Sequence, residues 1–170
     1  MVEGQWVDLD GYARELSVTV VPDANEPLMT RLLHFDPDSG GSCLLVAFPT
    51  GWERGSGAYS CFEHAVILDG SIELDGDLWE AGTSFVVPAD AQRRRTFAPS
   101  GAMAVAWFSA TPRWNGGGAI DGPASSAEWS GDLTDANAAS DEVDALGRRW
   151  RHIEAGSVSD NSFLRYSWVH

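Results

Sequence analysis

Short segments in which apolar and polar residues alternate recur along much of the chain. Residues 12–21 and 29–35 alternate branched or bulky apolar residues with polar ones, and the turn-forming sequence PDANEP separates them. Residues 42–48 (SCLLVAF) are nearly all apolar, which indicates a strand that is covered on both faces. Because a period of two residues is the pattern of a β-strand, these three segments predict strands.

The next part of the chain predicts more strands, separated by turn residues. They are expected at residues 62–68, 71–74, 84–87, 94–97 and 102–109. Asp69-Gly70, Asp75-Gly76 and Ala81-Gly82 punctuate them and supply the positive φ that tight reversals require. Many short strands at regular spacing predict an all-β fold, either an antiparallel sandwich or a closed small barrel.

The composition changes beyond Thr111, and this change predicts the domain organisation. We expect a barrel over residues 1–112 that includes the N-terminal strands, and a long Gly/Ala/Ser-rich loop or linker over residues 113–140. Residues 141–170 are expected to form a C-terminal extension that packs on the barrel or on a partner subunit. Its start, 141–147, is compatible with a helical turn, and the remaining tail alternates like strands.

Charge and cysteine content exclude several classes of partner. The chain has 170 residues, with 25 acidic against 11 basic ones and a formal charge of −14. That field repels nucleic acids and anionic lipids, so we expect neither as a partner. No apolar run is long enough to span a bilayer, the N-terminus lacks a secretory pattern, and two cysteines cannot form a disulfide framework. The sequence therefore predicts a cytoplasmic protein.

Two pairs of residues in the middle of the chain have a spacing that is typical of a known family. Glu63 is followed by Gly70 after six residues, and Gly82 is followed by Pro88 after five. This spacing resembles parts of the two cupin motifs, G-x5-H-x-H-x3,4-E-x6-G and G-x5-P-x-G-x2-H-x3-N. The resemblance covers roughly residues 29–110. It implies a double-stranded β-helix, the jelly-roll small barrel of the cupins.

Most metal ligands of these motifs are missing. In cupins, three imidazoles and one carboxylate hold the metal. Neither spacer of the first motif places a histidine before the glutamate: the two positions fall on Gly57 and Tyr59, or on Ser56 and Ala58. In the second motif Asp90 stands for the glycine and Arg93 for the histidine. Arginine cannot be deprotonated and cannot ligate a metal. The chain therefore resembles a single-domain cupin with degenerate metal-binding motifs, and we expect no metal and no other cofactor.

Strand alternation predicts which side chains face the barrel interior. If Glu63 points inward, its face is shared by Gly57, Tyr59, Cys61, Ala65 and Ile67. On the strand of the second motif, Arg93 and Arg95 share a face while Arg94 points outward. We expect three catalytic residues: Glu63, Tyr59 and Arg93. The expected substrate-binding residues are Arg95, Cys61, Trp52, Trp107 and His34.

Each of these residues also has a purely structural interpretation. Glu63 and Arg93 could form a buried ion pair that only fixes strand register. Cys61 is better explained as a small buried side chain than as a nucleophile, because no histidine base shares its face. His64 lies on the opposite face by alternation. A rearranged metal site from His34, Glu63 and His64 is conceivable, although this spacing matches no known ligand pattern.

Three functions follow from these residues and from the resemblance. The first is a metal-independent enzyme of the isomerase, dehydratase, lyase or cyclase type, acting by acid–base chemistry on a small organic metabolite that is aromatic or polyketide-like. The second is a non-catalytic module that binds a small carboxylate or sugar through its arginines. The third is a metal-dependent cupin oxygenase with non-standard ligands. The resemblance also implies a homodimer.

Overall fold

A computed structural model describes residues 6–8, 15–117, 141–143, 149–158 and 161–169, and it describes side chains for residues 15–117. Two compact units make up the chain. One is Leu16–Gly131, and the other combines Met1–Glu15 with Asp132–His170. The described residues contain strands and no helix, so none of them forms a helix that could cross a membrane.

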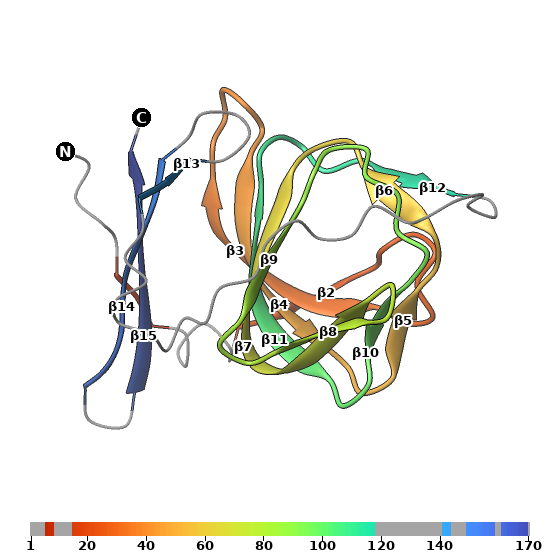
Figure 1. The fold of residues 1–170 in the computed structure, drawn as a ribbon, viewed down its shortest axis with the longest axis horizontal. Helices are drawn as coiled ribbons and strands as arrows, with labels where there is room; N and C mark the ends of the chain where they lie inside the picture. The colour runs from red at the N-terminus through yellow and green to blue at the C-terminus, as the bar shows by residue number, and fades with distance from the viewer. Residues whose placement is uncertain (1–5, 9–14, 118–140, 144–148, 159–160, 170) are drawn as a thin grey trace. The chain divides into compact units, whose positions relative to one another are not determined.

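The first unit is a curled antiparallel sheet that forms a jelly-roll barrel, as Figure 1 shows. Its main path runs β2-β3-β4-β11-β7-β10-β5, with β8 and β9 also paired to β7, while β12 pairs with β6. The predicted all-β jelly roll is therefore confirmed. The strands are β2 (Ser17–Thr19), β3 (Leu28–Phe35), β4 (Ser42–Phe48), β5 (Trp52–Arg54), β6 (Gly57–Tyr59), β7 (Glu63–Leu74), β8 (Asp77–Glu80), β9 (Ser84–Val87), β10 (Thr96–Ala98), β11 (Ala102–Phe108) and β12 (Trp114–Gly116).

The longest strand of the barrel, β7, connects its two halves. Its first part pairs with β9 and β11, and its second part pairs with β8 and β10. The predicted reversal at Asp69-Gly70 is wrong, because the strand continues through it with a register shift against β11. Gly70 has φ +70°, and an added Cβ would overlap the carbonyl oxygen of Gly101. A glycine is therefore required where the strand bends.

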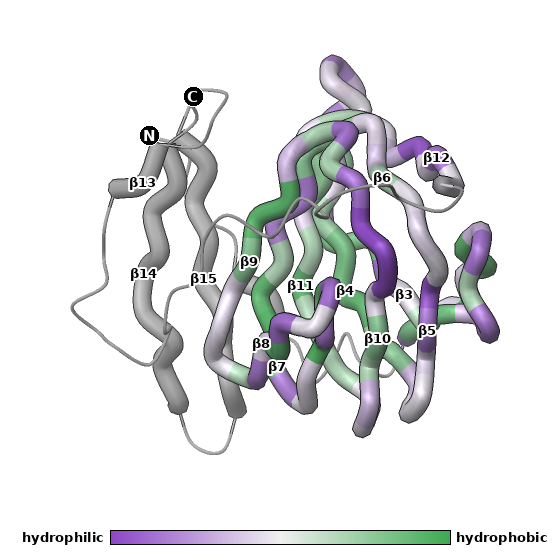
Figure 2. The backbone as a smooth tube through the Cα atoms, turned by 45° about the vertical axis from the view of Figure 1, so that its right-hand side comes forward, coloured by the Kyte–Doolittle hydropathy of each residue, from purple (hydrophilic) through white to green (hydrophobic). Residues whose placement is uncertain are grey.

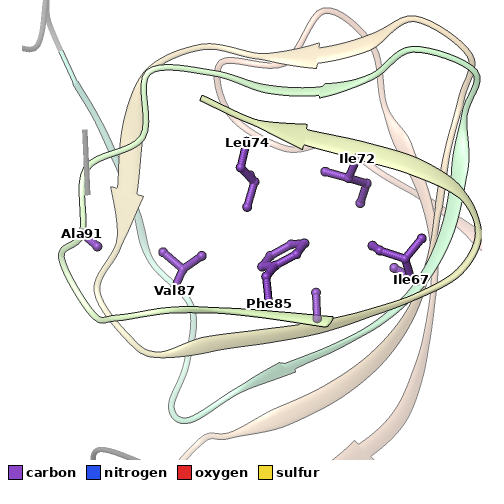
Figure 3. Close-up of a cluster of buried hydrophobic side chains, with 8 residues drawn as sticks. Ile67, Ile72, Leu74, Phe85, Val87 and Ala91 are labelled. Atoms are coloured by element: carbon purple, nitrogen blue, oxygen red, sulfur yellow. The ribbon is translucent and has the colours of Figure 1, made fainter. Parts of the chain in front are cut away.

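The interior of the barrel is apolar. Figure 3 shows side chains from both parts of β7 and from β9 pointing into one cluster, with Phe85 near its centre. The cluster comprises Ala65, Ile67, Ile72, Leu74, Phe85, Val87, Ala91 and Ala104. In Figure 2 the hydrophobic stretches likewise concentrate on the barrel strands β4, β7, β9 and β11. Burial of this surface is the main stabilising term for a barrel of this size.

The second unit is a four-stranded antiparallel sheet. Its order is β1-β15-β14-β13, made by β1 (Trp6–Asp8), β13 (Asp141–Val143), β14 (Arg149–Val158) and β15 (Asn161–Val169). The strand-like pattern of the C-terminal tail is confirmed. Residues 141–143 form a strand instead of the start of a helical turn, and 144–147 lie outside the described residues, as do 118–140 of the predicted loop. Because β1 pairs with β15, the first strand belongs to this sheet.

Replacing Gly70 by alanine tests whether the bend of β7 depends on this glycine. The variant combines an unfavourable positive φ with overlap on Gly101, so we expect unfolding in urea to show a loss of about 3 kcal/mol or more. Gly76→Ala is the matched control, because Gly76 also has positive φ (+101°) but nothing within 4 Å of an added Cβ. The control should lose only about 1–2 kcal/mol. Equal losses in the two variants would contradict the proposed close contact.

Candidate functional site

A cavity of about 390 Å³ lies inside the barrel. Most of its wall is apolar, built from aliphatic and aromatic side chains of β3, β4, β7, β9 and β11. Among the described residues, three groups with a formal charge line it: Glu63 on β7, Arg93 before β10, and Arg54 on β5. The volume lies within the range of small-molecule sites, and an apolar cavity with a few polar groups is typical of them.

Glu63 and Arg93 form an ion pair in this wall. Arg93 Nη2 donates to Glu63 Oε2 at 2.5 Å, and the side chains are only 6% and 12% exposed, respectively. The backbone places the arginine, since Gly57 and Arg93 exchange two N–H···O bonds of 2.9 Å each. The two residues predicted from the degenerate motifs are thus brought together, and the negative charge of Glu63 is met by a guanidinium.

Arg54 is a third charged residue of the wall, and it was not among the site residues predicted from the sequence. It is 4% exposed at the end of β5. Its Nε donates to the carbonyl of Pro22 at 3.0 Å, and its Nη1 donates to Tyr59 Oη at 2.7 Å. Its guanidinium lies 3.4 Å from the centroid of the Trp114 ring. The one signal in the sequence was the alternation Trp-Glu-Arg over residues 52–54, which puts Trp52 and Arg54 on one face.

Tyr59 lies beside both guanidiniums, at 5.0 Å from Arg54 and 5.2 Å from Arg93, measured to its ring centroid. Burial raises the pKa of its phenol, and the nearby carboxylate of Glu63 raises this pKa further. Both effects disfavour the phenolate. Tyr59 therefore stays a neutral phenol around neutral pH. It lines the cavity, as the strand alternation predicted.

Packing opposes an imidazole at one of the two ligand positions of the first motif. A Cβ at Gly57, one of the two histidine positions, would overlap the indole ring of Trp114. Asp90, which stands for the glycine of the second motif, keeps a left-handed backbone with φ +61°. A left-handed turn residue is thus retained at Asp90, while Trp114 fills the space beside Gly57.

The donor set of the cavity does not fit a metal ion. Among the described residues, no three or more histidine, cysteine, aspartate or glutamate side chains gather closely enough to hold one. The carboxylate of Glu63 faces cations that would compete with a metal for it. The conceivable site from His34, Glu63 and His64 does not form, since neither histidine lines the cavity.

Two of the predicted substrate-binding residues lie at or near the cavity. Trp52 lines it, is 2% exposed, and donates its indole N–H to the carbonyl of Glu26 at 2.9 Å. Cys61 is 4% exposed and packs in the hydrophobic cluster that contains Trp52, without lining the cavity. Burial is the main cause that raises the pKa of the Cys61 thiol, so it remains protonated, as expected of a small buried side chain.

Arg95 does not share the face of Arg93, so that prediction is wrong. Arg94 is exposed as predicted, but the chain bends there before β10 begins, and the alternation shifts by one residue. Arg95 consequently points away from the cavity and pairs with Glu53 at 3.0 Å and with Glu73 at 3.5 Å.

Trp107 and His34 also lie away from the cavity. Trp107 is buried opposite His64 across β11 and β7, and the two rings stack with centroids 5.4 Å apart. This confirms that His64 is on the face opposite Glu63, and it means that Phe108 is the aromatic residue that β11 contributes to the cavity wall. His34 is exposed near the end of β3. The predicted binding roles of these two residues have no support from their positions.

The raised pKa of Tyr59 predicts a specific titration. The unfolded chain ionises its tyrosines at a pKa of about 10. The stability that comes from keeping Tyr59 neutral is therefore present below pH ~10 and is lost as the pH rises through the higher pKa of the folded state. The chain has three tyrosines and no lysine. Tyrosinate absorbance should show a tyrosine that titrates above its ordinary pKa, and Tyr59→Phe should remove that step. If Tyr59→Phe removes only a step near pH 10, the phenol is not held neutral.

Comparison with known proteins supports the fold assignment. No protein-family model matches the chain, and no curated protein matches it. Solved structures do match. The candidate dioxygenase from Nostoc punctiforme is 19% identical with a TM-score of 0.61, and the match covers 89% of this chain but 56% of that one. An acetylacetone dioxygenase from Acinetobacter johnsonii is 16% identical with a TM-score of 0.51, covering 56% of this chain and 68% of that one. Both are cupin-like proteins, so the chain has the cupin fold.

Proposed function

We propose that the barrel is a metal-independent enzyme that carries out acid–base chemistry on a small organic metabolite. The observation that carries the proposal is the carboxylate of Glu63 in the wall of an apolar cavity, flanked by Arg93 and Tyr59. A proton acceptor beside groups that stabilise an oxyanion is the arrangement that proton transfer next to a carbonyl requires.

The two carboxylate oxygens of Glu63 have different roles in this proposal. Oε2 accepts the hydrogen bond from Arg93, which holds the carboxylate in place. Oε1 takes no hydrogen bond from the described residues, and we assign proton transfer to it. It removes a proton from a carbon next to a substrate carbonyl, and the developing enolate oxygen is stabilised by the phenol of Tyr59 and the guanidinium of Arg93.

The next step decides the type of reaction. If Glu63 returns the proton to a different carbon, the result is an isomerisation. If a β-substituent leaves with its bonding electrons and takes the proton from Glu63, a double bond forms, and the reaction is a dehydration or another lyase reaction. If the enolate carbon attacks a second carbonyl in the same molecule, a ring closes, and Glu63 gives its proton to the alkoxide that forms. The aromatic and aliphatic wall suits a flat, aromatic or polyketide-like substrate.

A non-catalytic binding module is the second candidate. The close Glu63–Arg93 pair favours it, because an ion pair already neutralises the carboxylate and could serve only to position the arginine. In that case the cavity would bind a small carboxylate or sugar without turnover.

Replacing Glu63 by glutamine separates these two candidates. As a substrate-independent readout, a panel of small 1,3-dicarbonyl and α-aryl ketone compounds is incubated with the protein in D₂O, and deuterium exchange at carbon is followed by NMR. Wild type should accelerate exchange of at least one compound, and Glu63→Gln should lose about 10²–10⁴-fold of that acceleration. The glutamine can still accept the Arg93 hydrogen bond, so circular dichroism should show a retained fold.

Glu53→Gln is the matched control for this experiment. Glu53 is also a carboxylate paired with an arginine, but it pairs with Arg95 outside the cavity and is 47% exposed. It should exchange at the wild-type rate. Equal rates in Glu63→Gln and wild type would overturn the catalytic role, and ligand binding without exchange in wild type would favour the binding module.

A metal-dependent oxygenase with non-standard ligands remains a third candidate, because similar structures bear the name dioxygenase. Elemental analysis of protein purified without added metal tests it. From the donors of the cavity we expect well under one equivalent of iron, manganese, nickel or zinc, and unchanged proton exchange after dialysis against a chelator. Stoichiometric metal whose removal stops exchange would contradict the proposal. Cytoplasmic location and homodimerisation stay predictions.

A further inference from the structure

The charges in the cavity wall do not balance. Two guanidiniums, Arg54 and Arg93, face one carboxylate, Glu63. The ion pair with Glu63 neutralises Arg93. Arg54 has no carboxylate within ion-pair distance among the described residues, and the nearby carboxylate of Asp23 accepts the indole N–H of Trp114 at 2.8 Å. A buried charge without a counter-ion is costly, so the cavity favours an anion.

The hydrogen bonds of Arg54 leave one nitrogen of its guanidinium without an acceptor among the described residues. Its Nε and Nη1 are held by Pro22 and Tyr59, and its plane packs on Trp114. Its Nη2 is buried and has no hydrogen-bond partner among the described residues. The guanidinium is thus held in position by the protein, while one donor remains for a ligand. Such pre-organisation lowers the entropy that binding costs.

Two further unused donors belong to the same wall. The hydroxyl of Thr96 and the Nε of Arg93 are buried without a hydrogen-bond partner among the described residues, and both residues line the cavity. Thr96 is the direct cross-strand partner of Arg54 in the pairing of β10 with β5. Directly opposed residues of an antiparallel pair project to the same side of the sheet. The topology therefore puts the Thr96 hydroxyl on the same side of the sheet as the Arg54 guanidinium.

We infer that Arg54 and Thr96 form a subsite for the carboxylate of a monoanionic substrate, whose apolar part fills the rest of the cavity. This inference rests on the proposed function, since it gives the chemical class of the molecule that Glu63 would act on. One negative charge balances the net charge of the wall. A dianion such as phosphate would leave an excess negative charge beside Glu63 in an apolar site, and the wall offers no further cation for it among its described residues.

Binding of phenylacetate, followed by isothermal titration calorimetry, tests the subsite. Phenylacetamide is the neutral probe of nearly the same shape. We expect wild type to bind phenylacetate at least about 10-fold more tightly than the amide, because a charge-assisted hydrogen bond in a buried site is worth that much. Arg54→Gln should weaken phenylacetate binding about 10–100-fold and remove the preference over the amide. Arg95→Gln, which removes an equal charge outside the cavity, should bind like wild type.

Two more variants complete the test. Thr96→Val removes only the hydroxyl at nearly constant shape, and it should weaken phenylacetate binding about 5-fold even if Arg54→Gln does not fold. Glu63→Gln should bind phenylacetate as tightly as wild type or more tightly, because it removes a negative charge from the cavity. If Glu63→Gln loses deuterium exchange but still binds phenylacetate, proton transfer by Glu63 and carboxylate binding by Arg54 and Thr96 are tested separately.

Three outcomes would overturn the inference. The first is equal affinity of wild type for phenylacetate and phenylacetamide, or binding of neither. The second is equal weakening in Arg54→Gln and Arg95→Gln, which would mean that only the overall charge matters. The third is unchanged phenylacetate binding in a folded Thr96→Val variant.

Discussion

Burial of permanently charged guanidiniums in an apolar barrel is the constraint on which the site depends. An arginine cannot lose its proton, so each buried one must be met by a carboxylate, by acceptors of the protein, or by a ligand. Glu63 meets Arg93, and this explains why a single acid survives at the centre of the degenerate motifs. Arg54 is met only in part, by a carbonyl, a phenol and an indole face. In the inferred subsite, an anion supplies the acceptor that Arg54 Nη2 lacks among the described residues.

The fold was readable from the sequence because its signals are local. Turn residues such as Asp75 and Gly76 adopt positive φ and reverse the chain where predicted. Asp90 has a left-handed backbone although it replaces the glycine of the motif, so the spacing of the motif is still recognisable. The predicted reversal failed at Gly70, because a glycine with positive φ can also bend a strand that continues. The close approach of Gly70 to Gly101 distinguishes this bend from a turn, and the sequence does not show it.

The site was predictable only where alternation was unbroken. Counting in steps of two from Glu63 correctly places His64 on the opposite face of β7. The same count from Arg93 fails for Arg95, because a bend before β10 reverses the side to which every later side chain points. Whether Trp107 or Phe108 faces the cavity depends on how β11 is aligned with β7, and no local sequence pattern gives this alignment. The role of Arg54 has only a weak local signal, because β5 has three residues and the partner Pro22 lies 32 residues away in the chain.

The contact between Gly57 and Trp114 limits which substitutions the barrel can accept. The indole occupies the space of a side chain at position 57, stacks on Arg54, and donates to Asp23. A single change of Gly57 to histidine would therefore meet an occupied volume, and removal of the indole alone would expose a buried cation. Packing around Trp114, and not only the absence of ligand residues, therefore opposes an imidazole at position 57.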